Sequence, residues 1–302
     1  MSEEAGPGAS SSSFAAKSSA AEGEALNPVM TKKKSSDLKP RLIAGLVMAA
    51  VSLALAYAGP RPFALLVIGV ALVMCWEWGR VTRSEDFGPV LLAHGGAVLA
   101  AGALSAMGKP LFGIVLLIIG AGLLLVFSFG PRRMLSVAGV GYVGLPTVAM
   151  LWFRGDEPYG FLAILFIFLV VWGSDIGAFV AGRGIGGPKL WPRVSPNKTW
   201  AGLVGGLTAG LLAGRVFALF VPNASSLTLG ATGLALALVA QLGDLAESGL
   251  KRRFGIKDSS SLIPGHGGVM DRADSTVAVS VAVSILALLV SPDSPARALL
   301  GV

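Results

Sequence analysis

Acidic residues in and beside long apolar runs are the first candidates for chemistry in this chain. Four of them, Glu77, Asp175, Asp244 and Glu247, fall within or at the edge of such runs. A carboxylate in hydrocarbon costs at least about 2.5–3.5 kcal/mol on insertion scales, so each is a candidate functional group. Asp175 follows two small residues that would let another helix come close. We expect its carboxylate to contact a ligand or metal, with a structural hydrogen bond between helices as the alternative.

Glu77 differs from the other three because it lies between two tryptophans near the end of its apolar run. It also precedes Arg80 by three residues. Tryptophan is enriched at membrane interfaces, and residues three apart on a helix can form an ion pair. We therefore interpret Glu77 as an interfacial anchoring residue.

A polar stripe ends the apolar run near 226–248. Gln241, Asp244, Glu247 and Ser248 recur at helical spacing and therefore share one face of the last two turns. The glycine-rich segment that follows carries both signs of charge, on Lys251, Arg252, Arg253, Lys257, Asp258, His266, Asp271, Arg272 and Asp274. Such a mixture suits Mg²⁺ bound to a polyphosphate, because Mg²⁺ takes one or two carboxylates together with phosphates and water.

The composition indicates which elements must position these groups. Of 302 residues, 54% are hydrophobic and only 14% are charged, whereas ordinary globular domains carry about 25% charged residues. This excludes a soluble enzyme. The single cysteine, Cys75, excludes an intrachain disulfide and a cysteine-based metal site. The 41 glycines suit closely packed membrane helices. The fold class we predict is all-α, a polytopic transmembrane helical bundle.

Apolar runs recur along the chain, each long enough to cross a hydrocarbon core of about 30 Å. We place nine spans near 42–59, 62–79, 88–107, 110–129, 134–152, 159–181, 200–220, 226–248 and 273–291. Residues 1–40 hold no apolar run and are predicted to be a disordered tail. Residues 41–158 would form an N-terminal region of five spans, and residues 159–302 a catalytic region of four.

The positive charges predict the orientation of these spans. With the N-terminus inside, 19 of the 24 basic residues lie in cytoplasmic segments, four lie on the opposite side and Arg215 lies within a span. Positive residues favour the cytoplasmic side. The two longest loops, near 182–199 and 249–272, are then cytoplasmic, where a soluble anionic substrate would be met.

The segment from Ser248 to Asp274 contains the pattern S-x-x-K-R-x4-K-D, followed by P-G-H-G-G-x-x-D-R-x-D. It resembles the signature of the phosphatidate cytidylyltransferase family, also called CDP-diacylglycerol synthases. Segments 173–179, 195–200 and 241–244 resemble the same family, so the resemblance covers about residues 160–290. One departure is Ala201, where the family usually has glutamate.

The resemblance implies that CTP and phosphatidate react to give CDP-diacylglycerol and pyrophosphate. It implies an integral protein of the bacterial inner membrane, with CTP, phosphatidate and membrane lipids as partners and no nucleic acid. Mg²⁺ is the implied cofactor, and a second cation is plausible. A homodimer is one use of the glycine-rich face formed by Gly202, Gly206, Gly210 and Gly214, and internal packing is the other.

The site residues combine the resemblance with the charges described above. The predicted metal ligands are Asp244 and Asp271, with Asp175 and Asp274 as second candidates. The predicted catalytic residues are Asp244, Asp271, Lys257, His266 and Arg272. The predicted substrate-binding residues are Ser195, Lys198, Thr199, Lys251, Arg252, Gly265, Gly267 and Gly268.

Two other functions are compatible with parts of the sequence. A CTP-dependent enzyme that acts on another lipid, such as a polyprenol kinase, would need similar charges. A transporter would also place acids in membrane helices. The acids gather at the predicted cytoplasmic ends, and no clear internal repeat is present, so we favour the transferase.

Overall fold

The computed structural model describes residues 38–83, 88–128, 132–263 and 267–302, so the predicted tail lies outside the described residues. The helices are α1 Leu38–Ala58, α2 Pro60–Arg83, α3 Pro89–Ala106, α4 Pro110–Phe127, α5 Arg133–Gly155, α6 Gly160–Gly184, α7 Trp200–Phe217, α8 Ser226–Arg253, α9 Met270–Val290 and α10 Pro295–Leu300. A short 3-10 helix, Ala218–Phe220, follows α7, and two strands, β1 Lys189–Trp191 and β2 Ser195–Thr199, lie between α6 and α7.

The helices confirm the predicted all-α polytopic bundle. Eight helices among the described residues, α2 to α9, are long and apolar enough to cross a membrane. The apolar part of α1, Ile43–Ala58, is shorter than in these eight helices. Each predicted span coincides with one of these nine helices, because run length and hydrophobicity alone determine where a membrane helix forms. Four helices continue further than predicted: α2 to Arg83, α5 to Gly155, α6 to Gly184 and α8 to Arg253.

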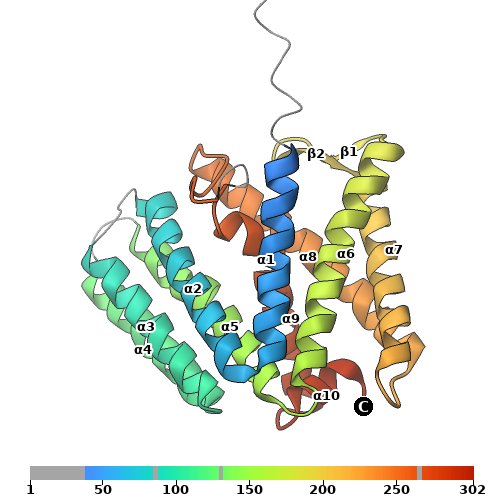
Figure 1. Cartoon of the computed structure of the whole chain (residues 1–302). Helices are drawn as coiled ribbons and strands as arrows, with labels where there is room; N and C mark the ends of the chain where they lie inside the picture. Colours follow the sequence, from blue (N-terminus) through green and yellow to red (C-terminus); the bar gives the residue numbers. More distant parts are fainter. Residues whose placement is uncertain (1–37, 84–87, 129–131, 264–266) are drawn as a thin grey trace, which may run out of the picture.

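The two predicted loops lie at one end of the bundle. Figure 1 shows the start of α1, the hairpin of β1 and β2, and the connection from α8 to α9 at the same end, with α10 and the C-terminus at the other. The hairpin is antiparallel, pairing Lys189 with Thr199 and Trp191 with Ser195. The sequence analysis placed this segment in a loop and did not predict strands, because each strand is too short to show a period.

Glycines set the close packing of α6, α7 and α8. Gly202, Gly206, Gly210 and Gly214 of α7 are all buried. A Cβ on Gly210 would lie 2.6 Å from the carbonyl oxygen of Gly233 in α8, too close for any side chain. The glycine-rich face therefore serves internal packing, since small residues let membrane helices approach backbone to backbone.

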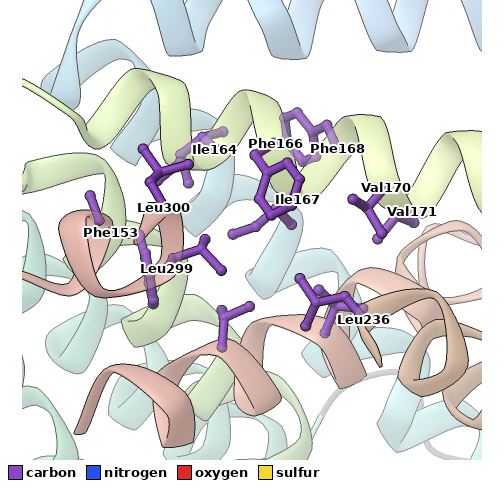
Figure 2. Close-up of a cluster of buried hydrophobic side chains, with 14 of the residues drawn as sticks. Phe153, Ile164, Phe166, Ile167, Phe168, Val170, Val171, Leu236, Leu299 and Leu300 are labelled. Carbon is purple, nitrogen blue, oxygen red and sulfur yellow. The ribbon is translucent and has the colours of Figure 1, made fainter. Parts of the chain in front are cut away.

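The C-terminal helix α10 closes the far end of the main core and was not predicted. Leu299 and Leu300 are 1% and 0% exposed, and they pack beneath α6 against Ile164 and Phe153 (Figure 2). The backbone N–H of Ala296 donates to Asp156 at 2.8 Å, which ties α10 to the turn between α5 and α6. Two turns of helix are too short to stand out as an apolar run.

The arrangement predicts that the signature segment and the end of α9 face opposite sides of the membrane. Single cysteines at Ser261 and Asp293, both exposed, would be introduced in a Cys75→Ser background; Cys75 itself is buried. We expect a membrane-impermeant thiol reagent to label Ser261→Cys only from the cytoplasmic side and Asp293→Cys only from the opposite side. Labelling of both from one side would show that α9 does not cross the membrane.

Candidate functional site

The predicted site residues come from four elements that meet at one end of the bundle. Asp175 lies on the last turns of α6 and Lys198 on β2, while α8 carries Asp244 and α9 begins beside Asp271. Lys198 Nζ lies 2.7 Å from Asp244 Oδ2. It also donates to the carbonyl of Gln241 at 3.4 Å. The hairpin therefore brings a predicted phosphate ligand onto the polar stripe of α8.

Two further aspartates, Asp175 and Asp274, lie near this pair. The carboxylate of Asp244 interacts electrostatically with Asp175 and Asp274, and Asp175 also interacts with Lys198 and Arg272. No described residue donates a hydrogen bond to Asp175, while Asp274 accepts from the backbone N–H of Ser275 at 2.7 Å. Negative charge is therefore concentrated here with few donors to offset it. A bound cation would relieve the repulsion.

Lys251 occupies a different position from the one its predicted role requires. Its Nζ lies 2.7 Å from Glu247 Oε2 and 2.8 Å from Asp271 Oδ1, and the side chains of these acids are only 1% and 4% exposed. Lys251 therefore donates a hydrogen bond to Asp271 and forms an ion pair with Glu247. Lys251 thus neutralises two buried carboxylates.

Asp271 is surrounded by donors from the protein itself. Its Oδ1 accepts from Lys251 Nζ, and its Oδ2 accepts from the backbone N–H groups of Ser259 at 2.9 Å and Gly268 at 2.7 Å. A carboxylate offers about four lone-pair positions. Asp271 therefore has fewer free lone pairs for a metal ion than Asp175, Asp244 and Asp274, which are also more exposed.

The structure corrects the interpretation of Glu77. Its side chain is 0% exposed, and its carboxylate accepts hydrogen bonds from four groups of the signature segment rather than pairing with Arg80. These are Ser259 Oγ, Ser260 Oγ, Val269 N and Met270 N. Arg80 instead lies over the ring of Trp76, 5.0 Å from its centre. The one sequence signal for this role is a glutamate inside an apolar run; its partners lie far along the chain.

The remaining predicted residues differ in exposure. Thr199 is buried and caps α7, because its Oγ1 accepts from the N–H of Gly202 at 3.0 Å. Ser195 is half-buried in β2. Arg252, Lys257 and Arg272 are exposed at the same end. Gly267 adopts φ +81°, and Gly268 is buried. The predicted Gly265 and His266 lie outside the described residues.

The described carboxylates fit a Mg²⁺ ion that shares its coordination with the substrate. Among the residues that the structure describes, no three His, Cys, Asp or Glu side chains form a metal-binding group. Mg²⁺ is commonly held by one or two carboxylates and completed by substrate phosphates and water. Asp244 with Asp175 or Asp274 matches that requirement, so the ion would bind together with its substrate.

Comparison with known proteins identifies the family of this chain. The model of the cytidylyltransferase family matches residues 39–290. The chain belongs to this family. It is 38% identical over 262 residues to a phosphatidate cytidylyltransferase of Brucella suis biovar 1 (strain 1330), covering 86% of this chain and 97% of the relative. It is 32% identical over 255 residues to the protein of that name from Bacillus subtilis (strain 168), covering 79% and 93%.

The family match extends well beyond the signature. It begins at residue 39 and therefore includes α2, which carries Glu77. The motif resemblance alone covered only about residues 160–290. The contact between Glu77 and the signature segment gives a physical reason for the N-terminal helices to belong to the same functional unit.

Replacement of Lys251 tests its role as a buried counter-ion. We expect Lys251→Met to lower the free energy of unfolding by about 3–5 kcal/mol, because two buried carboxylates lose their cation. Denaturation in detergent measures this loss. Lys257→Met is the control, since Lys257 is exposed and its loss should change stability by no more than about 0.5 kcal/mol. Equal stability of both variants would show that Lys251 does not neutralise the pair.

Proposed function

We propose that this protein is a phosphatidate cytidylyltransferase, which transfers CMP from CTP to phosphatidate and releases pyrophosphate. The observation that carries the proposal is the similarity to the Brucella protein over 97% of that protein's length. The clustering of Lys198, Asp244, Asp271 and Arg272 at one end of a membrane bundle supports it. One substrate is a membrane lipid and the other is a soluble nucleotide, so the reaction requires a site at the membrane surface.

The reaction is a displacement at the α-phosphorus of CTP. An oxygen of the phosphatidate phosphate forms the new P–O bond, and the bond between the α-phosphorus and the bridging oxygen to the β-phosphorus breaks. Pyrophosphate leaves with the bonding electrons. The attacking phosphate is already largely ionised near neutral pH, so no dedicated base is required. The protein must therefore hold two anions together in line and neutralise the charge that develops on the leaving group.

The cations of the site supply that neutralisation. Lys198 is held by Asp244 at 2.7 Å, so its ammonium group is positioned before a nucleotide arrives. Arg252, Lys257 and Arg272 are exposed at the same end and can reach phosphate oxygens. Lys251 remains with its two buried acids and acts on the geometry of the site.

Mg²⁺ is part of this proposal. Asp244 would hold the ion together with Asp175 or Asp274, as well as with phosphate oxygens of CTP. When bound, Mg²⁺ screens the phosphate charges and polarises the phosphorus that is attacked. The ion would also relieve the repulsion among the three aspartates.

We further propose that the site faces the cytoplasm from the bacterial inner membrane. The relatives named above are bacterial, and the positive residues favour this side for the hairpin and the signature segment. CTP is made in the cytoplasm, so a site on that side can reach its substrate.

Labelled nucleotide tests the function directly. Purified protein in mixed micelles receives phosphatidate, Mg²⁺ and CTP labelled either in the cytidine or at the γ-phosphate. We expect cytidine label to enter the lipid. A parallel assay replaces phosphatidate by polyprenol, and entry of γ-phosphate label into that lipid would indicate a CTP-dependent lipid kinase. If neither label enters either lipid, both enzyme functions are contradicted.

Two aspartate variants separate chemistry from folding. Asp244→Asn should lower turnover by roughly 100-fold or more, as loss of a group that acts on the transition state does. Its stability should change by about 1 kcal/mol at most, because its pair with Lys198 is partly exposed. Asp271→Asn should lower both turnover and stability, because an amide nitrogen would face donors. The fold is followed by thermal unfolding, and Asp293→Asn at the opposite end is the control. Near-normal turnover of Asp244→Asn at saturating Mg²⁺ would remove it from the site.

A further inference from the structure

Glu77 is completely withdrawn from solvent, and its carboxylate is held by hydrogen bonds rather than by an ion pair with any residue that the structure describes. Its Oε1 accepts from Ser260 Oγ at 2.6 Å and Val269 N at 2.9 Å. Its Oε2 accepts from Ser259 Oγ at 3.2 Å and Met270 N at 2.6 Å. Four hydrogen bonds satisfy the whole carboxylate. A buried carboxylate with this geometry stays in place because every alternative leaves it with fewer donors.

These four donors come from two separate stretches of the chain. Ser259 and Ser260 follow α8, whereas Val269 and Met270 begin α9, so one side chain of α2 joins both ends of the connection between these helices. Gly268 makes the approach feasible. A Cβ at this position would lie 2.8 Å from Cδ of Glu77 and would overlap Ser259 Oγ.

The start of α9 depends on this carboxylate. The first N–H groups of a helix have no partner within the helix and carry partial positive charge, which a side chain usually satisfies. At the cap position α9 has Val269, which has no side chain that can do so. Glu77 supplies the missing acceptor for Val269 and Met270, and Asp271 reaches back to Gly268. The orientation of the first turn of α9 is therefore set from α2.

That first turn carries the groups on which the chemistry depends. Asp271 contacts Lys251, Arg272 interacts with Asp175, and Asp274 interacts with Asp244. We propose that Glu77 is a positioning residue, which fixes the start of α9 and residues 259–260 so that Arg272 lies beside Asp175 and Asp274 lies beside Asp244. This proposal rests on the proposed function for its kinetic readout, but its structural part can be measured independently.

The main test variant is Glu77→Gln. The amide keeps the shape of the side chain, but one of its two polar atoms becomes a donor and leaves a donor of the signature segment unsatisfied. Glu157→Gln is the matched control, because it makes the same chemical change in the ion pair with Arg154 at the opposite end. Each variant is measured in two ways: kcat and KM for CTP per folded molecule, and hydrogen exchange of the amides of Val269 and Met270.

We expect Glu77→Gln to lower kcat per folded molecule by roughly 100-fold, a loss that a displacement of about 1 Å can cause. KM for CTP should change far less, and exchange at Val269 and Met270 should become faster. Glu157→Gln should alter none of these. A merely structural role would lower the amount of folded protein and leave kcat per folded molecule unchanged. That outcome, or unchanged exchange, would overturn the proposal.

Two further results keep the two proposals separate. If wild-type protein forms no CDP-diacylglycerol, the proposed function fails, and the exchange measurement alone decides the role of Glu77. If Glu77→Gln does not fold, the Ser259→Ala/Ser260→Ala double variant replaces it, because it removes two of the four donors and keeps the backbone pair. It should lower kcat roughly tenfold, a smaller loss than in Glu77→Gln because the two backbone hydrogen bonds to Glu77 remain. An unchanged kcat would then overturn the proposal.

Discussion

Three carboxylates, those of Glu77, Glu247 and Asp271, are removed from water at one end of a membrane bundle, and each needs a hydrogen-bond donor or a cation within the protein. Burying a charge without partners costs several kcal/mol. The connection between α8 and α9 folds around this requirement. It supplies the serine and backbone donors for Glu77 and the backbone donors for Asp271, while Lys251 lies between Asp271 and Glu247. The geometry of the signature segment follows from satisfying these groups together.

This requirement separates two kinds of charged residue that look alike in the sequence. Lys251 and Asp271 use their charges on each other, whereas Lys198 and Asp244 form a partly exposed pair beside two further aspartates. The first pair maintains the shape of the site. The second pair remains accessible to ions and phosphates. The pair that maintains the shape of the site thus lies in the signature segment, whereas the accessible pair joins β2 to α8 before that segment begins.

The sequence was sufficient to predict the helices and the end of the bundle at which the charges gather. The length of an apolar run can be read directly from the sequence, so all nine long helices were located. The hairpin Lys189–Thr199 and helix α10 are too short to produce such a signal. Glu77 was recognised as unusual but given the wrong partner, because Arg80 is near in sequence while Ser259 is 182 residues away. Pairings at that distance depend on how helices pack, and a local pattern does not contain that information.

The same long separation affects how the protein is made. Synthesis proceeds from the N-terminus, so α2 enters the membrane well before Ser259, Val269 and Met270 exist. Until they are synthesised, Glu77 has none of its final donors, and holding it in hydrocarbon costs about 2.5–3.5 kcal/mol on insertion scales. The buried carboxylate of α2 therefore lacks its stabilising contacts until residues 259–270 have been made. Formation of the candidate site therefore depends on a contact that closes across 182 residues of chain, and it cannot precede the synthesis of α9.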